Sequence, residues 1–214
     1  MKAEKVRFSG TISAVKGRIR LLRSFDQISH SYQGYTLVME GSVNGARAQH
    51  LRVAIGPKTH EQHRFRIGDQ VEGMAVPVPD PRQEWATHYK LSELKILRRG
   101  PVSEDVPPHP DGGIAAPLEV YRQQGRRRLD PKTYQRSCQR CPWGLVMATE
   151  LTIDHWKPWI KRWRFETHCY GPRDCPRYRP GKARTVPGRK PGMIWVDDDV
   201  EREAEEDGTA WPRR

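Results

Sequence analysis

Cysteine is the residue type in this sequence with the most recognisable chemistry. The chain has four cysteines, in two pairs, Cys138-x2-Cys141 and Cys169-x5-Cys175. A two-residue gap lets one tight turn direct two thiolates at the same ion, and a second pair completes a tetrahedral set of four sulfur ligands. The sequence therefore predicts a metal site formed by all four cysteines, with zinc as the expected ion.

Two other interpretations of the cysteines stay open. Cys141 and Cys175 are each followed directly by proline, as happens at one ligand of bacterial ferredoxins, and a five-residue gap is long for a zinc-binding turn. An iron–sulfur cluster is therefore the alternative cofactor, and it would suit a nucleic-acid-processing enzyme or a redox sensor. Four thiols without any metal are the simplest alternative, but their confinement to one segment argues against it.

The stretch between the two cysteine pairs combines aromatic and cationic side chains. Residues 156–165 hold three tryptophans and one phenylalanine among four lysines and arginines. Sites for single-stranded nucleic acid use this combination, because aromatic rings stack on bases while cations contact phosphates. The alternative is a small core, with Trp156, Trp159 and Trp163 on one helix face, or with Trp163 and Phe165 inward on a strand. We expect two of the three tryptophans to belong to such a core and at least one to contact nucleic acid.

The net charge indicates an anionic partner. The 214 residues include 38 Lys and Arg against 26 Asp and Glu, a formal charge of +12. A chain this basic attracts polyanions through counterion release, so nucleic acid is the expected partner, and an adaptor that docks an acidic protein is the alternative. Beyond Cys175 a basic arm spaced by Pro and Gly continues to Lys190. We hypothesise that the acidic tail after this arm folds back on it in the free protein. The tail would then compete with nucleic acid for the basic side chains of the arm.

Several classes of protein and of reaction find no support in the sequence. No run approaches the ~18 apolar residues of a membrane span, and the N-terminus lacks the apolar core of a secretory signal. We therefore expect a cytoplasmic chain without a membrane partner. The sequence contains no GxxxxGK[ST], GxGxxG, GxSxG or HExxH motif. Asp154-His155 is the strongest candidate for an acid–base pair, but adjacent acidic and histidine residues are common by chance. No catalytic residue is predicted, and binding is expected rather than catalysis.

Alternation of apolar and polar residues predicts a β-rich N-terminal half. Period-2 patterns run through residues 6–12, 18–25, 35–43, 46–55, 65–76 and 89–97. Asn44-Gly45 is a strong signal for a two-residue hairpin turn, and residues 58–65 allow one or two helical turns. The run Phe65-Arg66-Ile67-Gly68-Asp69-Gln70-Val71-Glu72-Gly73 resembles the entry into the fourth strand of many OB-folds.

The resemblance to OB-folds covers residues 5–98 and implies a groove that binds oligonucleotides across the second and third strands. Basic and aromatic residues of this part of the chain would line the groove: Arg18, Arg20, Arg23, Phe25, Tyr32 and Tyr35. For Phe25 and Tyr35 a place in the barrel core is an equal alternative, because strands expose only every second residue.

These observations combine into one expected architecture. We predict a mainly β chain with an OB-like five-stranded barrel at 1–99, a Pro/Gly-rich linker at 100–117, a small α+β four-Cys metal-binding module at 118–196 and an acidic tail at 197–214. Residues 118–129 are expected to form a basic helix. The predicted function is binding of single-stranded DNA or structured RNA. In the second module the expected contacts are Trp156, Trp159, Lys161, Arg162, Trp163, Arg164, Arg177, Arg179, Lys182, Arg184, Arg189 and Lys190.

Overall fold

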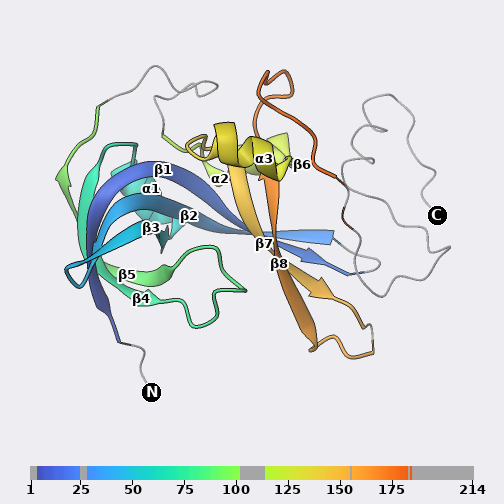
Figure 1. Ribbon diagram of the computed structural model, residues 1–214, viewed down its shortest axis with the longest axis horizontal. Coiled ribbons are helices and arrows are strands. Elements are labelled where there is room, and N and C mark those ends of the chain that lie inside the picture. The colour runs from blue at the N-terminus through green and yellow to red at the C-terminus, as the bar shows by residue number, and fades with distance from the viewer. Residues whose placement is uncertain (1–3, 25–27, 102–113, 155, 183, 185–214) are drawn as a thin grey trace.

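The computed structural model describes residues 4–24, 28–101, 114–154, 156–182 and 184. It is mainly β, with short helices between strands (Figure 1). In chain order the elements are β1 (Val6–Arg23), β2 (Ile28–Val43), β3 (Ala46–Ile55), α1 (Pro57–His63), β4 (Gln70–Pro77), β5 (His88–Arg98), α2 (Leu118–Gln124), β6 (Arg127–Arg128), α3 (Pro131–Thr133), the π-helical turn η1 (Tyr134–Cys138), β7 (Gly144–Thr152) and β8 (Lys161–Cys169).

The first five strands close on themselves. β1 pairs antiparallel with β2 along most of its length and with β4 near its N-terminus. β5 pairs antiparallel with β4 and, in parallel, with β3. The order around the closed sheet is therefore β1-β2-β3-β5-β4, and α1 connects β3 to β4. The predicted mainly β chain with a closed sheet of five strands is confirmed.

Glycine residues permit a two-residue turn and a close contact between strands in this sheet. Asn44 and Gly45 join β2 to β3 with positive φ angles of 49° and 82°, as a two-residue hairpin turn requires. Gly41 lies so close to β1 that a Cβ atom there would stand 1.9 Å from the carbonyl oxygen of Ser9. Glycine is needed at this position because any side chain would push the two strands apart. The predicted hairpin at Asn44-Gly45 is confirmed.

The Gly68-Asp69 pair of the OB-like run has a definite structural role. The Asp69 side chain is fully buried and accepts hydrogen bonds from the backbone N–H of Gly100 at 2.8 Å and of Arg66 at 3.1 Å. The Arg99 guanidinium lies 3.1 Å from the same carboxylate. A buried charge is stable only with such hydrogen-bond and ion-pair partners. Through them the Asp69 carboxylate connects the start of β4 to the end of β5.

The C-terminal elements extend the same sheet. β7 pairs in parallel with the far end of β1, with Leu21 opposite Thr149 and Arg23 opposite Leu151. β8 pairs antiparallel with β7, and β6 pairs with β8. One eight-stranded sheet therefore runs in the order β2-β3-β5-β4-β1-β7-β8-β6. Of the two arrangements open for the Trp-rich stretch, the strand is observed, because β8 contains Trp163. The expectation that Phe165 points inward on this strand is wrong, because Phe165 is exposed.

One apolar core also joins the two halves of the chain. Val15 and Ile19 of β1 belong to the same buried cluster as Tyr121 of α2 and Leu145 of β7. The contact is close at Gly17, where a Cβ atom would stand 3.2 Å from the Tyr121 ring and 3.5 Å from a methyl group of Leu145. The C-terminal half therefore shares buried apolar surface with the barrel.

The connecting segments differ in part from the expected ones. The basic helix predicted at 118–129 ends at Gln124, because the next residue, Gly125, adopts a positive φ of 63°. Residues 102–113 of the predicted linker and the acidic tail at 197–214 lie outside the described residues. Within the described part of the chain, no helix is long and apolar enough to cross a membrane.

Truncation of a core side chain in β7 should destabilise the whole chain. Leu145 is 1% exposed and lies in the shared cluster, so Leu145→Ala should lower the free energy of unfolding by about 2–5 kcal/mol. Urea unfolding followed by circular dichroism and by tryptophan fluorescence should show one coincident transition at lower urea. Leu97→Ala, at a side chain that is 58% exposed, is the control. A barrel transition left at its wild-type midpoint would contradict the shared core.

Candidate functional site

The four cysteines come together at the base of the β7–β8 hairpin, where they line one small cavity of about 10 Å³. Cys138 ends η1 and Cys141 follows in the turn before β7, whereas Cys169 ends β8 and Cys175 lies in the loop after it. The strand register explains this convergence, because Gly144 at the start of β7 pairs with Cys169. All four are free thiols, and Cys138 and Cys169 are buried.

Burial raises the pKa of two of the four thiols. Burial, with Cys141 as the next cause, raises the pKa of Cys138 to about 11. Burial also raises the pKa of Cys169, whereas the backbone N–H of Gly171, which donates to its Sγ at 3.3 Å, opposes this effect. A bound metal cation reverses such a shift, because it stabilises the thiolate and displaces the proton.

The metal site itself remains a prediction. Among the described residues, no group of three or more Cys, His, Asp or Glu side chains is placed so that it could hold a metal ion. What the structure shows is that four thiols from two turns line one cavity. This donor set fits a closed zinc site in the type and number of ligands, and also the iron–sulfur alternative.

A buried ammonium group holds the turn that carries Cys138 and Cys141. Lys16 of β1 is 1% exposed, and its Nζ donates to the carbonyl oxygens of Cys138 at 2.9 Å, Cys141 at 2.8 Å and Gly144 at 2.6 Å. Burial lowers the pKa of Lys16 to about 8, while the nearby thiols raise it. Sequence reasoning missed this role because Lys16 is one of several cations in β1, and nothing in the sequence distinguishes it.

Two arginines further along β1 lie beside the β7–β8 hairpin. The Arg20 guanidinium lies over the Trp163 ring, 5.1 Å from its centre, so β1 and β8 present a cation and an aromatic ring together. Arg18 donates to the Glu84 carboxylate, with Nε at 2.9 Å. Both arginines line an open groove of about 170 Å³ together with the loop between β4 and β5. The structure thus brings together predicted contacts from the two halves of the chain.

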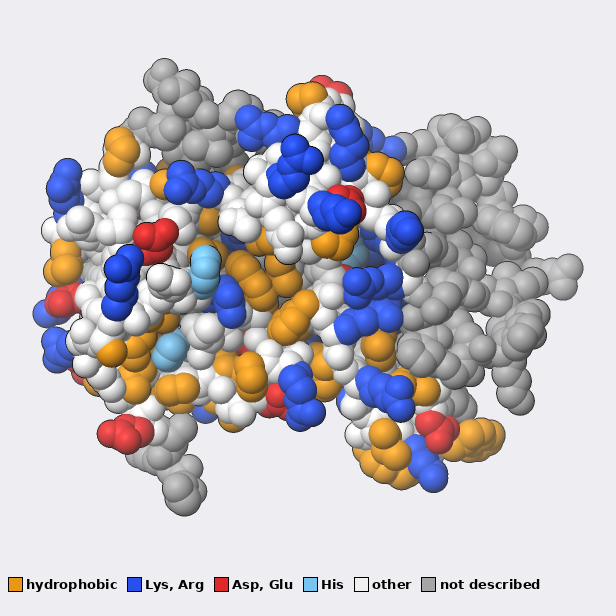
Figure 2. All heavy atoms as spheres, in the orientation of Figure 1, with side chains coloured by type: hydrophobic (Ala, Val, Ile, Leu, Met, Phe, Trp, Pro, Cys, Tyr) orange, Lys and Arg blue, Asp and Glu red, His pale blue; other side chains and the backbone are white. Residues whose placement is uncertain are grey.

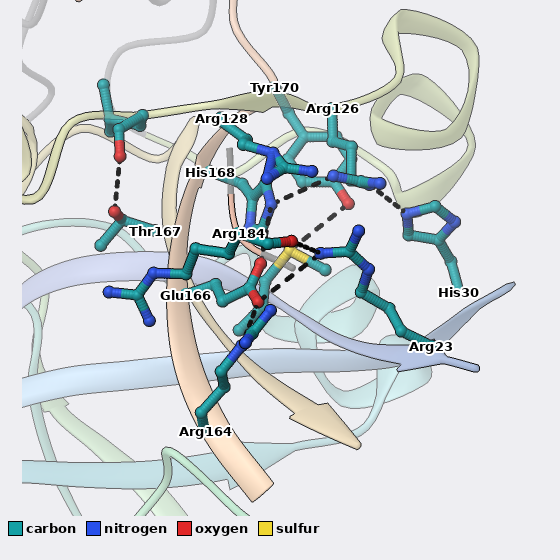
Figure 3. Close-up of polar contacts among 12 residues, drawn as sticks. Arg23, His30, Arg126, Arg128, Arg164, Glu166, Thr167, His168, Tyr170 and Arg184 are labelled. Carbon is teal, nitrogen blue, oxygen red and sulfur yellow. Dashed lines mark hydrogen bonds and ion pairs between the residues drawn. The ribbon is translucent and has the colours of Figure 1, made fainter. Parts of the chain in front are cut away.

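Arg23, by contrast, belongs to a buried cluster of charges (Figure 3). Its Nη1 lies 3.8 Å from the Glu166 carboxylate, to which Arg164 donates through Nε at 2.6 Å. Arg126 is also buried, with Nη1 at 3.2 Å from Nε2 of His168. Burial and, next, the charge of Arg126 hold the pKa of His168 well below its usual value, so this ring is neutral. The cluster ties β1 to β8 and leaves Arg23 almost no exposed surface.

The tryptophans divide into an exposed pair and a packed one. Trp156 is 84% exposed and Trp159 is 71% exposed, in the connection between β7 and β8, together with the exposed Ile160. We call these three residues the aromatic tip. Figure 2 shows apolar and basic side chains gathered at this end of the hairpin. A tryptophan core is therefore wrong for Trp156 and Trp159, whereas Trp163 is partly buried beside Arg20.

The other predicted contacts are distributed over the molecule. Tyr35 is buried in the core and donates its hydroxyl to the Ala116 carbonyl at 2.8 Å, whereas Tyr32 lies under the Arg122 guanidinium at 4.8 Å. Exposed cations of β8 and of the arm are Lys161, Arg162, Arg177, Arg179, Lys182 and Arg184. Phe25, Arg189 and Lys190 lie outside the described residues, and so does His155 of the Asp154-His155 pair.

Comparison with known proteins leaves the function to be argued from this geometry. No protein-family model matches the chain, and neither a functionally described protein nor a solved structure is detectably similar to it.

Removal of the buried ammonium group should loosen the cysteine turn. Lys16→Met removes the ammonium donor from three carbonyl oxygens, of which those of Cys138 and Cys141 keep a backbone N–H donor, and it should lower the free energy of unfolding by about 1–3 kcal/mol. Urea denaturation measures the loss, and hydrogen exchange should show faster exchange at the amides of Cys141 and Gly144. Lys58→Met, at an exposed lysine of α1, is the control. Unchanged stability and exchange would contradict the role given to Lys16.

Proposed function

We propose that this chain binds single-stranded nucleic acid through the aromatic tip and the adjoining face of β1. The observation that carries the proposal is the exposure of Trp156 and Trp159 among the exposed cations Lys157, Lys161 and Arg162. Large aromatic side chains exposed together mark interaction sites, and neighbouring cations select a partner that carries negative charge. Unpaired bases and their phosphates supply both the flat rings and the charge.

The contacts between β1 and β8 support a binding surface longer than the tip. Along β8 the surface leads to Trp163 and to Arg20, and from there to a groove that Arg18 and Arg20 line together with the carboxylates of Asp80 and Glu84. The OB-like interpretation of residues 5–98 is supported by the strand order and by the place of α1 between β3 and β4. OB-folds bind oligonucleotides on a curved sheet face and its loops, which is the kind of surface offered here.

In this proposal the cysteine cavity is a structural metal site. Cys138, Cys141, Cys169 and Cys175 would hold one zinc ion as four thiolates, and such a site would link the two turns that carry them. A closed site with four protein ligands leaves no position for a substrate, so the metal supplies stability rather than catalysis. Support comes from the shared cavity and from the N–H donor to the Cys169 sulfur.

The hairpin links the two sites. β7 and β8 pair over nine residue pairs, from Gly144–Cys169 at the cysteine cavity to Thr152–Lys161 next to the tip. At about 3.4 Å per residue the hairpin is roughly 30 Å long. Its far part is held by β1, because residues 21–23 pair with residues 149–151. A metal ion at the base would therefore fix the cysteine turns, while β1 holds the part of the hairpin next to the aromatic tip.

Substitution of a tip tryptophan should weaken oligonucleotide binding. Trp159→Ala should raise the Kd for a fluorescein-labelled 20-nucleotide oligothymidine by about fivefold or more, because one stacked base contributes ~1–3 kcal/mol. Fluorescence anisotropy measures the Kd, and the affinity of the wild type should fall steeply between 50 and 200 mM salt, about the range in which phosphate contacts are screened.

Leu97→Ala serves as the control, because Leu97 is also exposed and apolar but lies on β5. It should leave the Kd unchanged, and Trp159→Ala should not alter stability because the ring is largely exposed. A Kd that does not change with salt concentration, or that is equal for the wild type and Trp159→Ala, would overturn the proposal and favour an acidic protein partner.

Metal analysis tests the structural site. Freshly purified protein should be colourless and contain one zinc ion per chain, and Cys138→Ser should lose the ion and unfold at lower temperature. Ser137→Ala, which changes a neighbouring residue of the same cavity, should retain the ion. A brown protein that absorbs near ~400 nm would identify an iron–sulfur cluster instead, and protein without metal would contradict both cofactors.

A further inference from the structure

A second cavity lies between the barrel and α2, and none of its described lining residues belongs to β7 or β8. Its volume is about 660 Å³, within the range of small-molecule sites. The walls come from β2, from α1 and the residue after it, and from α2 and the segment just before it. This cavity is therefore separate from the cysteine cavity and from the aromatic tip.

Aromatic rings form part of the wall. Tyr35 and His60 lie with their ring centres 4.1 Å apart, and both are buried. Tyr32 is partly exposed on the same side, with the Arg122 guanidinium over its ring. Apolar groups such as Leu118 complete the lining. A wall of this kind favours a flat, unsaturated ligand, because such a ligand can contact rings without losing internal freedom.

His60, a residue of this wall, has a buried nitrogen without a hydrogen-bond partner among the described residues. Nε2 of His60 lies 3.2 Å from the carbonyl oxygen of Ala115, so this nitrogen carries the hydrogen. Nδ1 is then an acceptor, and it is buried without a hydrogen-bond partner among the described residues. Burial lowers the pKa of His60, which keeps the ring neutral. Buried polar atoms are normally paired, so an N–H of a ligand is the group that this nitrogen lacks.

Charged side chains of both signs stand at the opening. Arg64 and Arg122 are exposed and line the cavity, as do the carboxylates of Glu61 and Glu119. Guanidinium groups bind phosphate with paired hydrogen bonds. Carboxylates accept hydrogen bonds from the amino and imino groups on the edges of bases. Together the rim offers partners for a ligand that has a hydrogen-bonding ring at one end and a phosphate at the other.

We infer that this cavity binds one nucleobase together with its phosphate, stacked beside Tyr32 and hydrogen-bonded at its edge. The inference rests on the proposed function, because a chain that binds single strands meets unpaired bases with phosphates attached. The occupant is either a base of the bound strand or a free mononucleotide, which share this chemistry.

Isothermal titration of the full chain with 5′-mononucleotides tests the inference. At least one of AMP, GMP, CMP and UMP should bind with a stoichiometry of one, about tenfold tighter than ribose 5-phosphate, which lacks the base. Arg122→Gln should weaken this binding by about fivefold or more, because it removes the cation but keeps an exposed polar side chain. Lys58→Gln, on α1 but outside the cavity lining, is the matched control and should bind as the wild type does.

The outcomes separate this inference from the proposed function. If Arg122→Gln weakens both mononucleotide and oligonucleotide binding, the occupant is a base of the strand; if it weakens only mononucleotide binding, the occupant is a free nucleotide. Equal binding of ribose 5-phosphate and mononucleotides, or no mononucleotide binding, overturns the inference even where Trp159→Ala still weakens oligonucleotide binding. Mononucleotide binding without any oligonucleotide binding overturns the proposed function alone.

Discussion

The parallel pairing of β1 with β7 is the constraint on which the rest of the structure depends. β1 spans Val6–Arg23, and its N-terminal part closes the barrel while its last residues lie against the C-terminal half. Lys16 strengthens this junction, because its ammonium group binds three carbonyl oxygens of the cysteine turn. The orientation of the β7–β8 hairpin therefore follows from the barrel.

The hairpin has a polar and sulfur-rich base and an apolar free end. Residues at its base line the cysteine cavity, and Lys16 binds the turn next to that cavity. Its free end carries the exposed Trp156 and Trp159. An exposed pair of rings can select a partner only if the rest of the molecule holds the two rings in a fixed position. The shared core under β7 and the ladder of β7 with β8 provide that support.

The basic residues fall into two classes with different roles. Lys16, Arg23 and Arg126 are buried and bonded to carbonyl oxygens, a carboxylate or a histidine ring. These cations stabilise the junction between the halves and contribute little to the field outside. The cations that remain exposed lie on β8 and on the arm after Cys175, and also on other faces of the molecule, for example at Lys58, Arg82 and Arg122. Net charge therefore overstates the positive charge that a partner meets on one face.

Local patterns in the sequence determined the strands of the barrel, the Asn44-Gly45 turn and the pairing of cysteines into two short turns, because each depends on neighbouring residues alone. Alternation along a strand left open whether Tyr35 faces the core, and the helical spacing of the tryptophans left open whether Trp159 does. Only the tertiary structure decided this, together with the burial of Lys16 and Arg23 and the cavity around His60. The reason is that burial depends on which distant strand lies opposite, and the pairing of β1 with β7 brings together residues more than a hundred positions apart.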